Sequence, residues 1–232
     1  MQRTPVELGI DGLDGTLGHR VYTVLRDQIL NMSLEPGFVL RKGALCEQLG
    51  VSRSPVAEAL GKLSSEGLVD IVPQSATRVS RLSLTAIQEE SFLREAIEVA
   101  AVAKIANERS EEQLCKLSRN LRLQTLLIED GDHAGFFEAD VEFHNLILQF
   151  TGFPKVIAAA DHLSLQLLRA RMLLLPTKGR PKEAVEEHQA ILDAIKAKDS
   201  KAARASMAIH LRQLIDRLTP LETTHPEFFR KA

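Results

Sequence analysis

The sequence predicts a mainly α-helical protein, in which a winged helix-turn-helix precedes an all-α bundle of about six helices. Residues 45–79, LCEQLGVSRSPVAEALGKLSSEGLVDIVPQSATRV, follow the order helix, tight turn, helix and two short strands. From residue 84 onward, apolar residues recur at helical spacing and strand patterns end. We expect a flexible N-terminus over 1–17, the winged unit over 18–82, the bundle over 83–220 and a loosely ordered tail over 221–232.

Length and composition agree with two soluble domains. The 232 residues are 44% hydrophobic, which is enough for a core in each domain. The N-terminus lacks the apolar segment of a signal peptide, and no run approaches the roughly 18 apolar residues of a membrane span. Two cysteines are too few for a disulfide framework. We therefore expect a cytoplasmic protein that does not contact membranes.

Three helices are predicted in the winged unit. The first covers about 19–31, where apolar residues form one stripe, and the segment SLEPG ends it. The second covers 42–49, and Gly50 after it supplies the left-handed residue that a sharp turn requires. The third begins near Ser52 or Ser54, either of which can cap free amides, and it ends at Gly67.

The wing follows as a predicted hairpin. Strand patterns cover 68–72 and 77–80, and Pro73-Gln74-Ser75-Ala76 forms the turn between them. Apolar residues alternate along both strands, so one face of the hairpin is expected to pack against the helices.

The outer face of the third helix is the predicted DNA-reading surface. Arg53 can reach a guanine edge or a phosphate, and Ser52 and Ser54 can hydrogen-bond phosphate beside the free helix amides. The alternative is a charged face that water merely solvates. The full set of candidate DNA contacts is Arg41, Lys42, Ser52, Arg53, Ser54, Lys62, Thr77 and Arg78.

Net charge gives no support to nucleic-acid binding. The chain carries a formal charge of -2. The local excess is modest, with Arg41, Lys42, Arg53 and Lys62 set against Glu47 and Glu58. We therefore expect salt-sensitive binding with few phosphate contacts per subunit, strengthened by dimerisation.

The remaining chain predicts about six amphipathic helices. Glycine, proline and short polar segments separate them, as is usual for helix ends. The expected ranges are 84–109, 111–130, 133–151, 154–174, 181–197 and 200–219, with a loop over 176–181.

Four residues of this bundle form a candidate metal site. Asp140 and His144 are four residues apart on one helix, so both emerge from the same face. His188 and His210 lie among apolar residues at helical spacing, which directs both imidazoles inward. Three imidazoles and a carboxylate suit a divalent transition metal, although inward histidines are more often hydrogen-bonded core residues.

The segment LGVSRSPVAEALGKLSSEGLV resembles the signature of the GntR family of bacterial transcription regulators, as does LEPGFVL before the second helix. The resemblance covers about residues 18–82. It implies a DNA-binding regulator. The chain departs from the family where an arginine is common at Ala57 and where an Arg-Gly pair is common at Ser75-Ala76, so no base contact is assigned to those positions.

The bundle is similar to the FCD type of effector domain that often follows GntR heads. That resemblance implies a metal held by Asp140, His144, His188 and His210, and the helix count resembles the VanR-type subgroup. It also implies an effector pocket near Arg94 and Glu98, in the context RE-x-x-E, although these two may simply pair with each other. Arg169 and Arg171 are weaker effector candidates.

Together these features predict a dimeric repressor of a roughly palindromic operator, modulated by a small carboxylate effector bound at the metal. Zinc is the expected ion, with nickel, iron or manganese as alternatives. One rival hypothesis is a metal-dependent hydrolase or lyase, against which no separate general base is evident and the reading unit would be unexplained. Another is a regulator that senses the metal itself.

Overall fold

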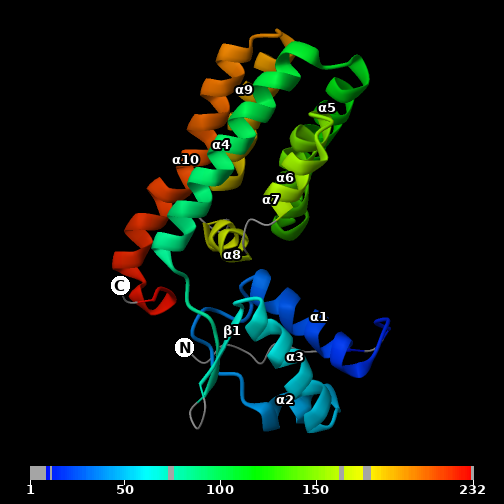
Figure 1. Cartoon of the computed structure of the whole chain (residues 1–232), viewed down its shortest axis with the longest axis vertical. Coiled ribbons are helices and arrows are strands. Elements are labelled where there is room, and N and C mark those ends of the chain that lie inside the picture. Colours follow the sequence, from blue (N-terminus) through cyan, green and yellow to red (C-terminus); the bar gives the residue numbers. More distant parts are fainter. Residues whose placement is uncertain (1–8, 11, 73–75, 162–164, 175–178, 231–232) are drawn as a thin grey trace. The chain divides into compact units, whose positions relative to one another are not determined.

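The computed structural model describes residues 9–10, 12–72, 76–161, 165–174 and 179–230 (Figure 1). Most of the wing turn predicted at 73–76, the first part of the loop predicted at 176–181, and the start of the predicted flexible N-terminus lie outside these residues. The mainly helical fold class is confirmed. The chain divides into two compact units, 1–83 with 222–232 and 84–221, which are described separately here.

The first unit contains the predicted helix-turn-helix and wing. Its elements are α1 (Leu17–Leu30), α2 (Lys42–Leu49), α3 (Arg53–Ser65), β1 (Val69–Ile71) and β2 (Thr77–Val79). The side chain of Thr16 caps α1 by accepting from the amide of His19. Gly50 ends α2 with φ 64° and ψ 30°, the left-handed conformation that the sharp turn into α3 requires.

Helices α1 and α3 pack together through fully buried aliphatic side chains. Val21, Leu25 and Ile29 of α1 lie one turn apart, and Val56, Leu60 and Leu63 form the matching stripe of α3. This stripe leaves the opposite side of α3 in water.

The wing is an antiparallel pair in which Val69 lies opposite Val79 and Ile71 opposite Thr77. Val39 and Leu40, which the sequence does not predict as a strand, also pair with β2. Val39 forms an isolated antiparallel bridge with Arg78, and the Leu40 amide donates to the Thr77 carbonyl at 2.8 Å. The far edge of β2 is therefore also paired with backbone.

The second unit is a helical bundle (Figure 1). Its core gathers buried aliphatic residues, Met207 and Phe143 from five of its helices. None of its helices, among the described residues, is long and apolar enough to cross a membrane. The elements are α4 (Leu84–Glu108), α5 (Glu111–Glu129), α6 (His133–Phe150), α7 (Pro154–Asp161), α8 (Leu165–Leu174), α9 (Arg180–Lys196) and α10 (Ser200–Thr224).

Two differences from the predicted helices of the bundle exceed two residues. The helix expected over 154–174 is described as α7 and α8, on either side of 162–164, which lie outside the described residues. Helix α10 was expected to stop at residue 219, but it continues through Pro220 to Thr224. Proline lacks only one backbone donor, and the Leu218 side chain just before it is fully buried, so packing maintains the helix there.

The C-terminal tail was expected to be loosely ordered, and this is wrong for residues 225–230. A short 3-10 helix, η1 (Pro226–Phe228), leads into a parallel bridge between Phe229 and Leu82. The Leu82 amide donates to the Phe228 carbonyl at 2.9 Å, and the Arg230 amide donates to the Leu82 carbonyl at 2.8 Å. The Phe229 side chain is only 3% exposed. The tail is thus an integral part of the first unit.

Replacing Phe229 tests this role of the tail. Phe229→Ala removes a buried aromatic ring, so we expect the free energy of unfolding of the first unit to fall by about 3 kcal/mol. Urea unfolding measures it. Phe38→Ala is the matched control, because the Phe38 side chain belongs to the same unit and is 51% exposed. Equal stability of the two variants would contradict the packing described for the tail.

Candidate DNA-reading surface and metal centre

The start of α3 is open to solvent. Ser52, Arg53 and Ser54 are all exposed, and the Ser52 side chain makes no hydrogen bond to the first turn of the helix. Free backbone amides, a guanidinium and two hydroxyl groups therefore face water together, as an anion-binding helix start requires. Arg41 and Lys42, at the start of α2, are also exposed.

Three of the predicted DNA contacts have partners within the unit. The ammonium of Lys62 lies 3.7 Å from the centre of the Tyr22 ring, whose hydroxyl donates to Glu66 at 2.8 Å. Arg78 donates to the Gly37 carbonyl at 3.3 Å, and the Thr77 carbonyl accepts from the Leu40 amide. Lys62 is exposed, but its charge is held over an aromatic face, so the charge of Arg53 is the freer one on α3.

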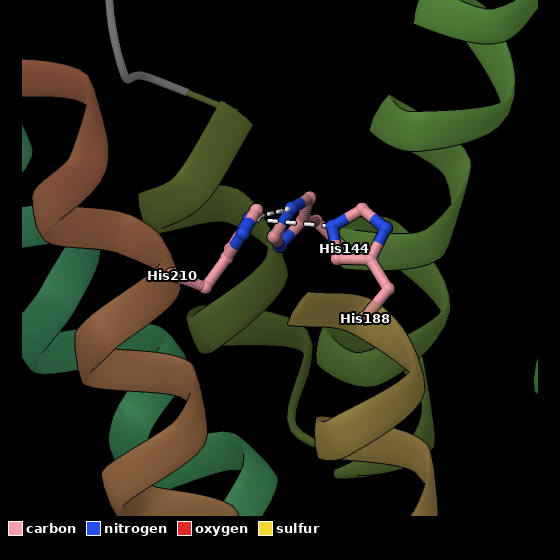
Figure 2. A group of neighbouring side chains, drawn as sticks. All are labelled: His144, His188 and His210. Carbon is pink, nitrogen blue, oxygen red and sulfur yellow. Dashed lines mark hydrogen bonds between the residues drawn. The ribbon is translucent and has the colours of Figure 1, made fainter. Parts of the chain in front are cut away.

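In the helical unit, the four residues predicted to hold a metal are all buried. Asp140 and His144 come from α6, His188 from α9 and His210 from α10. Figure 2 shows the three imidazoles pointing toward one another. The Nε2 atom of His210 lies 3.1 Å from that of His144 and 3.3 Å from that of His188. Residues far apart in the sequence thus direct three ring nitrogens to one point.

The other ring nitrogen of each histidine already has a partner. Nδ1 of His144 lies 2.5 Å from Glu98, Nδ1 of His188 lies 2.8 Å from Gln124, and Nδ1 of His210 lies 2.6 Å from Glu187. All three partner atoms are side-chain oxygens, which can only accept. Each Nδ1 therefore carries a proton, and in a neutral ring the converging Nε2 atoms are left as lone pairs.

Gln124 holds its oxygen toward His188 because its amide nitrogen is engaged elsewhere. That nitrogen donates to Asn120 Oδ1 at 2.7 Å and to the Ala139 carbonyl at 3.3 Å. Both amide side chains are buried. This network fixes which way the amide faces and so fixes the tautomer of His188.

Burial keeps the imidazoles neutral. Burial lowers the pKa of His144. It lowers the pKa of His188 and of His210 well below the ordinary value, and for these two residues the neighbouring imidazoles are the next largest cause. Burial alone would raise the pKa of the Glu98 carboxyl, but the charge of Arg94 and the hydrogen bonds from His144 and Arg94 outweigh it and lower that pKa. At neutral pH the rings are uncharged, and carboxyl groups lie behind two of them, Glu98 behind His144 and Glu187 behind His210.

Asp140 lies beside the three imidazoles. One carboxylate oxygen is 3.6 Å from His188 Nε2, and the other accepts from Arg171. Three neutral imidazoles with a neighbouring carboxylate form a ligand set that suits zinc and related divalent ions. The tight group that could hold an ion comprises His144, His188 and His210.

Two cavities adjoin this cluster, and Arg94 and Arg171 line both. The first, of about 60 Å³, is also lined by Asp140, Arg180 and His210. The second, of about 140 Å³, reaches Glu98 and His144. The guanidinium of Arg94 donates to Glu98 through Nε at 2.6 Å, while its buried Nη2 has no hydrogen-bond partner. A donor of this kind beside a cavity is suited to a ligand oxygen.

The proposed effector residues have different roles in the structure. Arg94 lines both cavities. Glu98 pairs with Arg94, the alternative left open by the sequence, and it also orients His144. Arg169 is fully buried and is not among the residues that line either cavity, whereas Arg171 lines both.

Sequence reasoning missed Gln124, Glu187 and Arg180. Gln124 lies on a helix with no other chemical signal, so its role follows only from the fold. Glu187 directly precedes His188, which made it visible as a neighbour but not as the partner of His210. Arg180 forms a two-pronged ion pair with Glu187 at 2.9 and 3.0 Å.

Comparison with known proteins gives two family matches. The model for bacterial regulatory proteins of the gntR family matches residues 17–79, and the FCD domain model matches residues 91–213. The chain is 34% identical over 213 residues to an uncharacterised HTH-type transcriptional regulator of Streptomyces ambofaciens, covering 90% of this chain and 88% of that protein.

Two further relatives are similar over nearly the whole chain. The HTH-type transcriptional repressor RspR of Escherichia coli K12 is 28% identical, over 92% of this chain and 93% of its own length. The solved structure of E. coli McbR/YncC is 26% identical, with a TM-score of 0.69, over 89% of this chain and 99% of its own.

The amide network behind His188 can be tested by its effect on stability. Gln124→Leu leaves Asn120 Oδ1 and His188 Nδ1 without the partner that Gln124 provides, so we expect the free energy of unfolding to fall by about 1–3 kcal/mol. Urea unfolding in the presence of a chelator measures it, so that metal does not contribute. Gln149→Leu on α6 is the control, because Gln149 is exposed. A stability loss no larger than that of the control would show that the network does not contribute.

Proposed function

This chain belongs to the GntR family of bacterial regulatory proteins and carries an FCD domain, and from that membership we propose a metal-dependent, effector-controlled repressor. The family makes the chain a DNA-binding transcriptional regulator. The proposal adds that a small organic acid, bound beside a divalent metal in the helical unit, changes how tightly the protein holds its operator.

The observation that carries the metal proposal is the convergence of three imidazole lone pairs. Their Nε2 atoms lie 3.1 and 3.3 Å from one another, and acceptors behind the rings exclude the alternative tautomers. Facing lone pairs repel unless a cation or proton lies between them, and burial disfavours the proton. We assign zinc as the expected ion, with Asp140 completing the ligand set of His144, His188 and His210.

The cavities beside the imidazoles support an acid as the effector. When bound, the metal would supply a Lewis-acidic centre for a ligand oxygen. Arg94 contributes the unpartnered Nη2, and Arg171 lines the same space. A guanidinium in a buried site selects carboxylate oxygens over neutral groups.

Control of DNA binding requires that the acid prefer one arrangement of the protein over another. That preference limits the shift in operator affinity, typically to about 1–3 kcal/mol. We propose a homodimer on a roughly palindromic operator, since a two-fold protein matches a two-fold site.

The DNA-reading assignment rests on Arg53, so its removal is the direct test. Arg53→Ala deletes the freest charge at the start of α3, and we expect loss of specific operator binding without loss of fold. Footprinting on genomic fragments and a thermal melt measure the two effects. Arg119→Ala is the control, because Arg119 is exposed on α5, outside the reading unit. An unchanged footprint for Arg53→Ala would exclude this part of α3 as the reading surface.

The metal assignment is tested at His188, which is fully buried. His188→Ala removes one of three converging nitrogens, so we expect bound zinc to fall well below one ion per chain in elemental analysis. The response of operator binding to added acid should weaken with it. His133→Ala, an exposed position on the same helix as His144, should retain the ion.

Two outcomes would change the proposal. Full metal content in the His188→Ala protein would remove that residue from the site. Operator affinity that follows free zinc without any organic acid would make the ion itself the signal.

A further inference from the structure

The structure also indicates the charge of the effector. We propose that the ligand is a short dicarboxylate, with one acid group at the metal and the other between Arg94 and Arg171. This inference rests on the proposed metal-dependent effector site and adds a chemical class to it.

The first step is a charge balance of the site. Among the side chains that the structure describes, the charged groups that line the two cavities or hydrogen-bond the imidazoles are three guanidinium groups, of Arg94, Arg171 and Arg180, and three carboxylates. Each guanidinium is paired with one carboxylate, Arg94 with Glu98, Arg171 with Asp140 and Arg180 with Glu187. An imidazole that ligates a metal through Nε2 is a neutral ring, so the described side chains add no net charge to that of the ion.

A divalent cation would therefore leave two positive charges without counter-charge. All of these groups are largely buried, with side-chain exposures from 4% to 18%. Uncompensated charge in such surroundings is costly, because water cannot solvate it. A monocarboxylate would cancel half of the excess and a dicarboxylate all of it.

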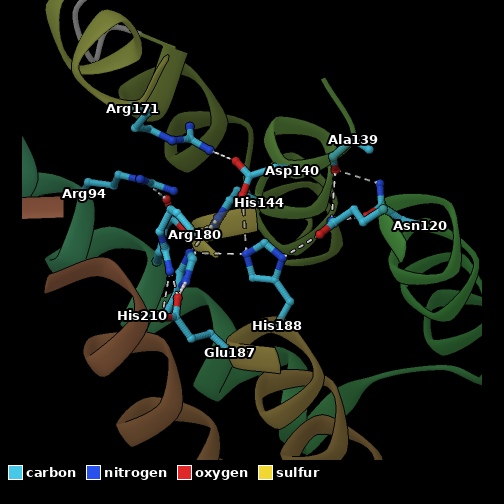
Figure 3. Close-up of polar contacts among 12 residues, drawn as sticks. Arg94, Asn120, Ala139, Asp140, His144, Arg171, Arg180, Glu187, His188 and His210 are labelled. Carbon is cyan, nitrogen blue, oxygen red and sulfur yellow. Dashed lines mark hydrogen bonds and ion pairs between the residues drawn. The ribbon is translucent and has the colours of Figure 1, made fainter. Parts of the chain in front are cut away.

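The second step is the position of the free donor. Nη2 of Arg94 is buried and has no hydrogen-bond partner, and the whole residue is only 6% exposed. Arg94 comes from α4 and Arg171 from α8, and both line both cavities. Figure 3 shows the two side chains extending toward Asp140 and His144. If one acid group of the ligand binds the metal, the guanidinium groups of Arg94 and Arg171 remain available to bind its second acid group.

The third step is size. The second cavity, of about 140 Å³, has room for about ten water-sized groups. Apart from Arg94, Glu98, His144, Asn145 and Arg171, its walls are apolar, formed by Val141, Leu148, Ala160, Leu165, Leu167 and Leu168. A dicarboxylate with two carbon atoms between its acid groups, such as succinate, has eight non-hydrogen atoms and fits both the volume and the walls.

The test compares acids of equal length on the full chain loaded with zinc. Isothermal titration calorimetry with succinate and with butyrate separates a second acid group from chain length. We expect succinate to bind about 10- to 100-fold more tightly, the usual effect of an added charge-assisted hydrogen-bond pair. Inorganic phosphate is titrated as a compact anion and should bind more weakly than succinate.

A variant identifies the second acid site. Arg171→Gln should reduce the preference for succinate over butyrate to less than about threefold, whereas Arg119→Gln, an equal loss of charge at an exposed position, should leave it unchanged. If Arg171→Gln does not fold, the comparison of the two acids on the unaltered chain still decides.

The outcomes separate this inference from the function on which it rests. Equal binding of butyrate and succinate to zinc-loaded protein would overturn the dicarboxylate and leave the metal site intact. Phosphate binding as tight as that of succinate, in competition with it, would replace a two-ended acid with a compact anion. A chain that cannot be loaded with zinc would overturn both proposals.

Discussion

The arrangement of three buried imidazoles, each with Nδ1 directed at an acceptor and Nε2 at its neighbours, is the constraint on which the helical unit depends. Bringing lone pairs to 3.1 and 3.3 Å is unfavourable without a cation, and apolar packing alone would not produce it. Residues behind the rings enforce it. The orientation of Glu98, Gln124 and Glu187 therefore matters to the site as much as the histidines do.

These outer partners also connect the bundle. Glu98 comes from α4, Gln124 from α5 and Glu187 from α9, while the rings that they orient come from α6, α9 and α10. Glu98 has a second role, because it also accepts from Arg94, which lines the cavities. A ligand that draws Arg94 away would therefore act on His144 through a single carboxylate. The structure thus places the cavity-lining guanidinium and the ring-orienting carboxylate in direct contact.

The sequence predicted most of the fold because its signals are local. Apolar spacing marked the helices, Gly50 marked the turn, and the four-residue separation of Asp140 and His144 placed both on one face of α6. The partners of the rings could not be predicted, since Gln124 meets His188 only after α5 and α9 have packed. The ordered tail was missed for a related reason. Phe229 carries no helical or strand pattern, and its bridge to Leu82 joins residues at distant positions in the chain.

The bridge between Leu82 and Phe229 has a practical consequence for handling the protein. Because residues 225–230 are built into the first unit, a purification tag or reporter fused after the last residue would be carried by the unit that contains the wing. The turn at Lys198 and Asp199, between α9 and α10, is exposed and belongs to the helical unit. A label inserted at this turn would be carried by the helical unit and not by the unit that contains the helix-turn-helix.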